Sequence, residues 1–319
     1  MKRRGRALDG ILILDKPAGM TSNRALQIVK RLYSAAKAGH TGSLDPLATG
    51  VLPLCLGEAT KFSQYLIDAN KGYRSTFIFG VRTNTSDADG EVIAEADASA
   101  LTETMVEAAL ANFRGDIKQI PSMFSAIKKD GQPLYKLARA GLEVEREARA
   151  VTVFELELEA FRPGPRAEVD VRILCSKGTY VRSIAEDLGQ LLEVGAHVSV
   201  LRRIKAGPFV EADTISLATL EGLKDAEAIE QLDSLLKPAS IAVETLPKVT
   251  LGEAAGFYLR QGQPVLVSRA PTSGFVQLFL SAGDFIGVGE ILDDGRVAPR
   301  RLVNQPAVAD LTSRSGAAE

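Results

Sequence analysis

The sequence predicts a two-domain protein of mixed α and β structure, with a large N-terminal part and a small β-rich C-terminal part. Its 319 residues exceed the usual size of a single domain, so two domains are the default expectation. Helix-like and strand-like patterns alternate up to about residue 237, and short apolar segments separated by glycine turns follow residue 247. A chain of this length buries enough surface to fold without disulfides.

The first third of the chain predicts one clear helix among strands. Residues 21–23, Thr-Ser-Asn, are all good N-cap residues, and apolar residues then recur at helical spacing, so we predict an amphipathic helix over residues 22–33. Alternation after residue 71 places Tyr73 on one face of a strand together with two phenylalanines. The other predicted elements here are strands over 11–15, 51–56 and 71–82 and a shorter helix over 58–67.

The remainder of the chain predicts an antiparallel hairpin, further helices and a terminal β-module. Two alternating segments, 151–161 and 167–175, flank the turn Arg-Pro-Gly-Pro and predict the hairpin. A proline-containing stretch over 237–247 marks the expected domain boundary, and the polar tail after residue 302 is expected to fray. The other predicted elements are helices over 102–113, 133–140, 179–192 and 252–261, and strands over 197–204, 265–268, 275–280, 285–292 and 297–302.

Residues 39–57 contain four glycines and two prolines. Glycine permits close backbone approach and proline ends regular structure, so we predict an ordered loop over 40–49 that leads into the strand 51–56. This loop offers one carboxylate, Asp45, and one imidazole, His40. A lone carboxylate on a loop braced by a strand is a candidate nucleophile. The alternative is that Asp45 and the following proline start a turn.

The net charge of −2 conceals an uneven distribution of charge along the chain. Residues 1–82 carry 13 Lys and Arg against 5 Asp and Glu, whereas residues 83–319 carry 25 against 35. Positive charge returns over residues 113–139, where two aromatic residues are interleaved, and in a cluster formed by Arg202, Arg203 and Lys205. This distribution is compatible with an anionic partner at one face, and the alternative is an ordinary solvated surface.

Several classes of protein and site find no support in the sequence. No run of about 18 apolar residues is present, so no membrane span is expected, and the short apolar stretch near the N-terminus does not fit a signal peptide. Cys55 and Cys175 lie far apart in apolar runs and read as reduced core residues of a cytoplasmic protein. With His40 and His197 they do not form a zinc-binding pattern, and no nucleotide-binding or nucleophile-elbow motif occurs.

Several long motifs resemble, in order, those of one enzyme family. Residues 39–50, Gly-His-Thr-Gly-Ser-Leu-Asp-Pro-Leu-Ala-Thr-Gly, closely resemble the catalytic motif of the TruB family, the tRNA pseudouridine-55 synthases. The C-terminal part is similar, through weaker motifs, to the PUA-type RNA-binding domain of that family. The resemblance covers most of residues 10–210 and continues through residues 15–17, 71–74, 120–126, 175–182 and 196–203.

The resemblance implies an α+β fold. Its pseudouridine-synthase-like core would have a mixed, largely antiparallel sheet flanked by helices, and a small C-terminal β-rich PUA-like domain would follow. The implied organisation is a catalytic domain over residues 1–240 with a basic thumb-like insertion over about 121–145, a PUA-like domain over 245–305, and a flexible tail over 306–319.

The resemblance also implies an isomerase and assigns its residues. Asp45 would be the nucleophile, acting either by capturing C1′ of the ribose or by helping to expel uracil toward a glycal. Tyr73 would stack on the flipped base and is the best candidate for proton transfer, and Arg182 would pair with Asp45 and lower its pKa. The implied substrate-binding residues in the uracil pocket are Tyr180 and Leu201. His40 would occupy the space left by the flipped nucleotide or stack on a neighbouring base. Lys16 would support the site from behind the residues that touch the substrate.

The implied partner is tRNA, held by its T-arm and acceptor arm. The target uridine lies inside the folded T-loop and must be flipped out, which costs a few kcal/mol. No metal or organic cofactor is implied, because no redox step or hydrolysis occurs, and we expect a monomer. Two other functions remain open. One is an RNA-binding or tRNA-folding chaperone whose catalysis is incidental or lost, and this role can coexist with that of the isomerase. The other is a relative that acts with a guide RNA, which the lack of long basic extensions disfavours.

Overall fold

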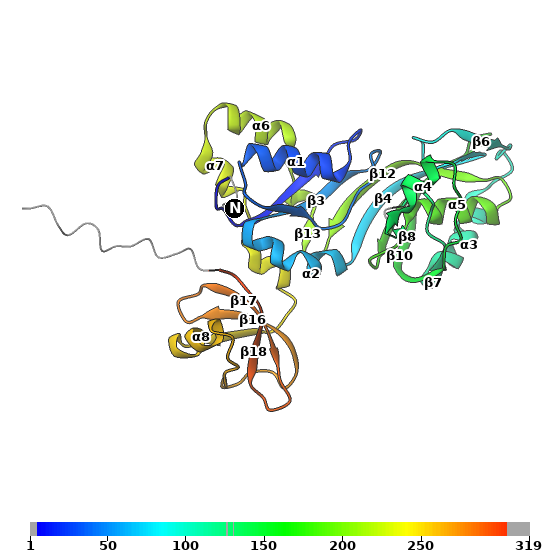
Figure 1. Ribbon diagram of the computed structural model, residues 1–319. Coiled ribbons are helices and arrows are strands. Elements are labelled where there is room, and N and C mark those ends of the chain that lie inside the picture. The colour runs from blue at the N-terminus through cyan, green and yellow to red at the C-terminus, as the bar shows by residue number, and fades with distance from the viewer. Residues whose placement is uncertain (1–4, 126, 130, 305–319) are drawn as a thin grey trace, which may run out of the picture.

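The main body of the protein is a long mixed sheet with helices packed against both of its ends (Figure 1). The computed structural model describes residues 5–125, 127–129 and 131–304. Most neighbouring strands of the ten-stranded sheet are antiparallel, and the pairs β1–β14 and β3–β12 are parallel. The order is β14 (Ile215–Ser216), β1 (Gly10–Lys16), β3 (Thr49–Leu56), β12 (Ala196–Ala206), β4 (Lys71–Phe79), β11 (Glu168–Cys175), β10 (Arg149–Arg162) and β7 (Gly115–Gln119), with β13 (Phe209–Val210) paired to β12 and β2 (Ala38–His40) to β3.

The helices pack against the two ends of the sheet. One group, α1 and α6, lies against β1 and β3, and the other, α3 and α5, lies against β10, β4 and β12. The predicted mixed, largely antiparallel sheet flanked by helices is therefore confirmed. The helices are α1 (Ser22–Leu32), α2 (Ser63–Asp68), α3 (Glu103–Leu110), α4 (Leu134–Arg139), α5 (Val181–Leu191), α6 (Leu217–Asp225) and α7 (Ile229–Ser234), with 3-10 helices η1 (Gly57–Phe62), η2 (Ala111–Phe113), η3 (Glu211–Asp213) and η4 (Ala239–Val243).

The helix predicted over residues 22–33 is confirmed as α1. The hydroxyl of Thr21 caps it by accepting a hydrogen bond from the backbone N–H of Arg24, as the sequence predicts. Ala25, Leu26 and Val29 form the buried face of this helix. The hairpin predicted from residues 151–175 is confirmed as the antiparallel pair β10–β11.

The helix predicted over residues 58–67 is wrong in its first half. The chain forms the 3-10 helix η1 before α2 begins, and the hydroxyls of Thr60 and Ser63 each donate to the carbonyl three residues earlier. Such side-chain bonds compete with α-helical pairing of the backbone. At the start of η1, the backbone N–H of Glu58 donates to the Asp9 carboxylate, which draws the chain toward the N-terminal segment.

The strand predicted over residues 71–82 ends early, at Phe79. Gly80 has a φ of +81°, and a Cβ there would lie 2.6 Å from the Ala96 carbonyl oxygen and 2.7 Å from that of Pro165. The chain turns at this glycine, so the following residues pair elsewhere. They form a separate two-stranded sheet, β5 (Val81–Thr83) with β6 (Val92–Glu95), and a second small pair is β8 (Lys128–Lys129) with β9 (Gln132–Pro133).

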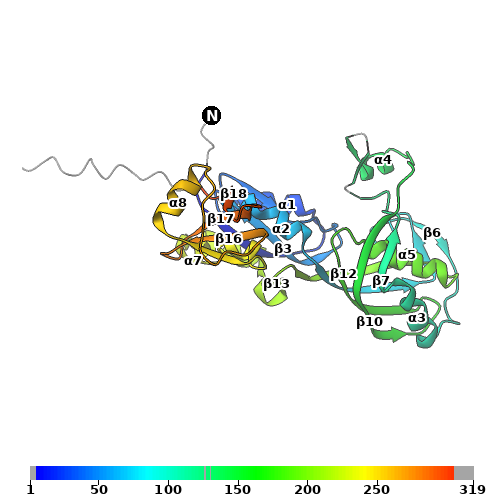
Figure 2. The ribbon, with the colours of Figure 1, turned by 90° about the horizontal axis from the view of Figure 1, so that it is seen from below.

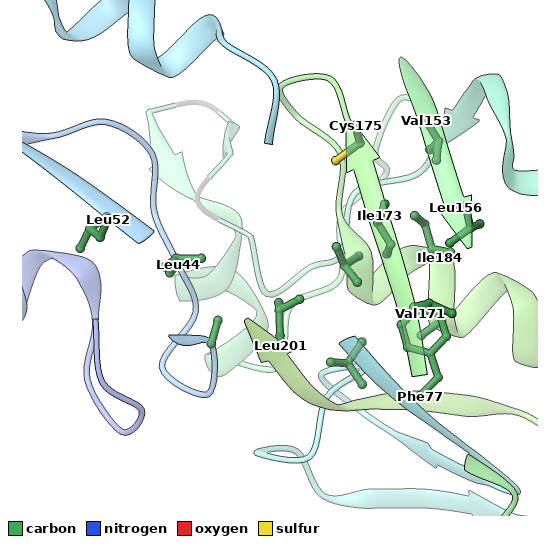
Figure 3. Close-up of a cluster of buried hydrophobic side chains, with 14 of the residues drawn as sticks. Leu44, Leu52, Phe77, Val153, Leu156, Val171, Ile173, Cys175, Ile184 and Leu201 are labelled. Carbon is green, nitrogen blue, oxygen red and sulfur yellow. The ribbon is translucent and has the colours of Figure 1, made fainter. Parts of the chain in front are cut away.

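The largest apolar core connects the far end of the sheet with the glycine-rich loop. Phe77 and Val171 pack with Ile184 of α5, and the same cluster extends to Leu201 of β12 and to Leu44 of the loop (Figure 3). Since Leu44 immediately precedes Asp45, the loop is anchored in the core. A side chain on an anchored loop is held in place by packing that its own sequence does not reveal.

The C-terminal sheet is parallel at one edge and antiparallel elsewhere, and α8 (Glu253–Arg260) packs on it. Residues 265–268 were expected to be one of its strands, which is wrong: Val265 contributes only a bridge to Val297, and Arg269 at φ +61° turns the chain away. The fourth strand of this sheet is instead β15, a four-residue segment that is too short to show a clear alternation in the sequence. The strands are β15 (Lys248–Leu251), β16 (Gly274–Leu280), β17 (Phe285–Ile291) and β18 (Val297–Leu302).

The C-terminal sheet is attached to the main body beside η1 and α2 (Figure 1). Val288 of β17 is buried in one cluster with Ile11 and Phe62, and Phe285 packs on Phe62 with ring centroids 5.2 Å apart. The Lys61 ammonium also donates to the Leu302 carbonyl oxygen at 2.8 Å. Across the residues that the structure describes, none of the helices is long and apolar enough to span a membrane.

Candidate active site

The loop that carries Asp45 is tied to β1 and α1 by polar contacts. The Ser22 hydroxyl accepts a hydrogen bond from the Leu44 backbone N–H at 2.7 Å. The Lys16 ammonium donates to the Met20 carbonyl oxygen at 2.7 Å and lies 3.4 Å from the Pro46 carbonyl oxygen, and the Lys16 side chain is fully buried. Burial lowers the pKa of Lys16 to about 8. Lys16 therefore holds the backbone beside Asp45 and lies outside the pocket wall.

Arg182 connects Asp45 with two other segments of the chain. Its Nε atom lies 2.9 Å from Asp45 Oδ2, and its Nη1 atom lies 3.5 Å from Asp87 Oδ2. The same guanidinium donates to the carbonyl oxygens of Thr85 at 2.8 Å and Phe124 at 3.1 Å. The Arg182 side chain is 4% exposed and the Asp45 side chain 38% exposed, so Arg182 is buried, whereas the Asp45 carboxylate is enclosed by protein on most sides and still reaches solvent.

The surroundings of Asp45 change its pKa in opposing directions. Burial raises the pKa of Asp45 above its ordinary value, and the negative charge of Asp87 acts in the same direction. The positive charge of Arg182 lowers the pKa of Asp45, as the family resemblance implied. The pKa is nevertheless raised overall, because the effect of burial is the largest. Asp45 therefore ionises at higher pH than an ordinary carboxyl group.

Asp45 opens onto a pocket with a volume of about 540 Å³. This lies within the range of roughly 300–1,000 Å³ that is typical of small-molecule sites. Tyr73 of β4 and Leu201 of β12 form part of its wall, and Tyr180, held by a hydrogen bond from its backbone N–H to the Gln119 side chain, forms another part. The pocket thus gathers five of the predicted site residues, which are Asp45, Tyr73, Tyr180, Arg182 and Leu201.

His40 lies beside the pocket without lining it. It ends β2, and its Nδ1 atom is buried with no hydrogen-bond partner among the residues that the structure describes. Burial lowers its pKa, which favours the neutral imidazole. No group of three or more His, Cys, Asp or Glu residues suited to a metal ion occurs in the described parts of the chain.

Two residues at the site escaped the sequence analysis. Asp87 is 5% exposed and contacts Arg182, but its polar turn carries no local signal that points to Asp45. Arg203 was assigned to a basic cluster with Arg202 and Lys205, and this was wrong for Arg203, which is 1% exposed and lines the pocket. Strand alternation is the signal that distinguishes Arg203 from Arg202, because it places Arg203 on the same face of the strand as Leu201 and Arg202 on the opposite face.

Three family models together match most of the chain. The "TruB family pseudouridylate synthase (N terminal domain)" matches residues 30–181, the "tRNA pseudouridylate synthase B C-terminal domain" matches 182–244, and "Pseudouridine synthase II TruB, C-terminal" matches 247–303. A "tRNA pseudouridine synthase B" of Saccharophagus degradans is 55% identical over 308 residues, which cover 95% of this chain and 98% of that protein. The chain belongs to the TruB family.

A second relative and two solved structures are also similar to this chain. A "tRNA pseudouridine synthase B" of Pseudomonas aeruginosa is 55% identical over 95% of this chain and 98% of its own length. The structure described as a "Cbf5-Nop10-Gar1 Complex" matches with a TM-score of 0.69 at 26% identity, covering 93% of this chain and 84% of that chain. An "H/ACA RNP bound to a substrate RNA containing 2'-deoxyuridine" matches with a TM-score of 0.70 at 25% identity, covering 96% and 91%.

The backbone at Gly50, the last residue of the motif over residues 39–50, predicts a large effect of substitution on stability. It has a φ of +97°, and a Cβ there would lie 2.2 Å from the Arg203 carbonyl oxygen. We expect Gly50→Ala to lower the free energy of unfolding by about 4 kcal/mol, through backbone strain and a steric clash. Gly19→Ala is the matched control, because Gly19 has a φ of +77° but nothing within 4 Å, and about 1 kcal/mol is expected. Urea titration measures both, and equal losses would contradict the prediction.

Proposed function

We propose that this protein isomerises uridine 55 in the T-loop of tRNA to pseudouridine. The observation that carries the proposal is the Asp45 carboxylate, which reaches a nucleoside-sized pocket and is paired with the buried Arg182. Relatives named tRNA pseudouridine synthase B are 55% identical over nearly the whole chain, whereas the matched chain of the Cbf5-Nop10-Gar1 complex is 26% identical. This difference favours a tRNA substrate.

The isomerisation leaves the atomic composition of the nucleotide unchanged. The bond from C1′ to N1 breaks, the uracil turns within the pocket, and a bond from C1′ to C5 forms; C5 loses its proton and N1 gains one. Asp45 would act at the ribose, either by attacking C1′ or by helping to expel uracil toward a glycal. Both routes require the ionised carboxylate, which the Arg182 guanidinium stabilises at 2.9 Å.

Residues of the pocket wall would hold the flipped uracil and accept the proton that its C5 atom loses. Tyr73 would stack on the base and is the proposed proton-transfer residue, and Tyr180 and Leu201 would complete the apolar walls. Burial raises the pKa of Tyr73, and the positive charge of Arg203 opposes that rise. His40 would contact the nucleotides beside the flipped base, and Lys16 would keep the Asp45 loop in position through its bonds to backbone carbonyls.

The RNA-binding surface would extend from the pocket along two parts of the chain. We propose residues 121–145 as a basic thumb on a catalytic domain spanning 1–240, and 245–305 as a PUA-like domain, together holding the T-arm and acceptor arm. The segment that carries α4 projects away from the sheet, as Figure 2 shows. In this segment, the exposed Lys128 and Lys129 form β8, and the Lys129 ammonium donates to the Glu145 carbonyl oxygen at 2.8 Å.

The thumb assignment predicts a change in salt dependence. We expect the double variant Lys128→Gln, Lys129→Gln to weaken tRNA binding and to reduce the slope of log affinity against log salt by about 1–2, because each lost phosphate contact removes about 0.9. The matched control is Lys224→Gln in the acidic segment 211–233, which should leave the slope unchanged. Filter binding across a salt series measures both slopes, and an unchanged slope in the double variant would contradict the thumb assignment.

Release of tritium from C5 of uridine tests the proposed function. The purified protein, without any guide RNA, should release tritium from a labelled tRNA transcript, and chemical mapping should locate pseudouridine at position 55. A T-arm hairpin should serve as a minimal substrate. Binding without tritium release would identify an RNA-binding or chaperone protein, and modification of a different uridine would contradict the proposed site.

A further inference from the structure

Arg203 is a buried cation with no role in the chemistry described so far. It lies on β12 with 1% exposure, and no carboxylate forms an ion pair with it in the described part of the chain. Its Nε atom donates to the Val51 carbonyl oxygen at 2.7 Å, and its Nη2 atom lies 3.4 Å from the Gly42 carbonyl oxygen. Burying an arginine without an anionic partner lowers the stability of the fold, so its position at the pocket wall points to a functional role.

The register of the sheet places Arg203 directly against Tyr73. The two residues are opposite one another in the antiparallel pair of β12 and β4, and directly opposed side chains lie on the same face. Both line the pocket, and the positive charge of Arg203 is close enough to Tyr73 to oppose the rise in the pKa of its phenol. One side chain therefore lies beside the proposed proton-transfer residue and, through the Gly42 carbonyl oxygen, contacts the loop that carries Asp45.

Other charged groups surround this pair. Lys16 of β1, Lys71 of β4 and His40 of β2 all have pKa values lowered by burial, and the charge of Arg203 adds to each shift. Cys175 of β11 and Asp45 of the loop also face Tyr73. The Lys71 ammonium is held by the carbonyl oxygens of residues 66, 67 and 69, whereas Arg203 is directly opposite Tyr73 in the sheet.

We propose that Arg203 is a positioning residue for the reaction, which orients the Tyr73 phenol and sets its separation from the Asp45 loop. Because the guanidinium lies beside the phenol on the same face of the sheet, it would restrict the orientations that the Tyr73 side chain can adopt in the pocket. The bond to the Gly42 carbonyl holds the loop at the same guanidinium. The proposal rests on the proposed function, because it assigns Arg203 a role in that same reaction.

A double-mutant cycle on single-turnover rates tests the proposal. With enzyme in excess over tRNA, Arg203→Gln should lower the rate by about 100-fold, within the range of about 10²–10⁴ for a misdirected proton-transfer group, and should change the tRNA Kd by less than about threefold. Arg203→Lys should recover about tenfold of that loss, since it keeps the charge but not the planar fork. In a Tyr73→Phe background, Arg203→Gln should cost less than about threefold, because its partner hydroxyl is already absent.

The control is Arg202→Gln, on the opposite face of β12, where the side chain pairs with Asp15 and Glu211 instead. It should leave the single-turnover rate unchanged. If Arg203→Gln lowered the rate equally in the wild-type and Tyr73→Phe backgrounds, the proposal would be overturned, and Arg203 would have only a structural role. If Tyr73→Phe is too slow to measure, the same cycle is run on urea midpoints, where non-additive shifts are expected and additive shifts overturn the contact. Absence of wild-type activity would instead reject the proposed function.

Discussion

Asp45→Asn is expected to lower the single-turnover rate of pseudouridine formation by at least about 10⁴-fold, as removal of a nucleophile does in other enzymes. The amide keeps the size of the side chain but can neither attack C1′ nor take a charge. Affinity for tRNA should stay within about tenfold, because most of it comes from phosphate contacts elsewhere. Tritium release and filter binding measure the two effects separately.

Asp284→Asn is the matched control for this variant. Asp284 is an exposed carboxylate in the turn between β16 and β17, and the same substitution there should leave the rate within about twofold, as surface changes away from a site usually do. In the wild type, the rate should rise with pH as Asp45 ionises. Because burial raises the pKa of Asp45, this rise should lie above the ordinary carboxyl value of 3.8. Near wild-type turnover by Asp45→Asn would exclude the proposed chemistry.

Arg182→Met is expected to damage both activity and stability. It removes the cation that pairs with Asp45 and leaves the buried Asp87 without its partner. Loss of one member of a buried ion pair costs about 3–5 kcal/mol, so the free energy of unfolding should fall by that amount. The rate should fall by about 10³-fold, and its rise with pH should move to still higher pH, because the charge that lowers the pKa of Asp45 is gone.

A second substitution separates these two effects. Adding Asp87→Asn to Arg182→Met removes the unpaired buried charge, so part of the lost stability should return, whereas the rate should not recover. Urea titration and single-turnover assays distinguish the outcomes. Recovery of activity in the double variant would show that Arg182 acts only through folding, and an unchanged stability of Arg182→Met would contradict the burial of the Asp87 pair.

The elements that the sequence predicted well are those in which every decisive contact is local. The cap of α1, its apolar face and the alternation of the β10–β11 hairpin involve residues within about four positions or direct strand neighbours, so the pattern contains the information. The errors occur where distant segments intervene. Asp9 and local hydroxyls form η1 in place of a longer helix, and the carbonyls of Ala96 and Pro165 turn the chain at Gly80.

For the site, the motif around Asp45 pointed to the family, but the electrostatics depended on contacts across the chain. The pairing with Arg182 was implied only by resemblance, since the two residues come from segments far apart in sequence. The contribution of Asp87 and the burial of Arg203 were not visible in any local pattern. Burial of a charge depends on everything packed around it, and that packing is set by the whole sheet.

By itself, the sequence determined most of the strands and helices, the loop that carries the candidate nucleophile, and the enzyme family to which the chain belongs. Only the tertiary structure decided that Asp45 opens onto a pocket, that burial outweighs Arg182 in setting its pKa, and that Arg203 lies against Tyr73. The physical reason is the separation along the chain over which each kind of interaction acts. Backbone preferences and side-chain periodicity act between near neighbours, whereas desolvation and charge pairing act between whichever segments the fold brings together.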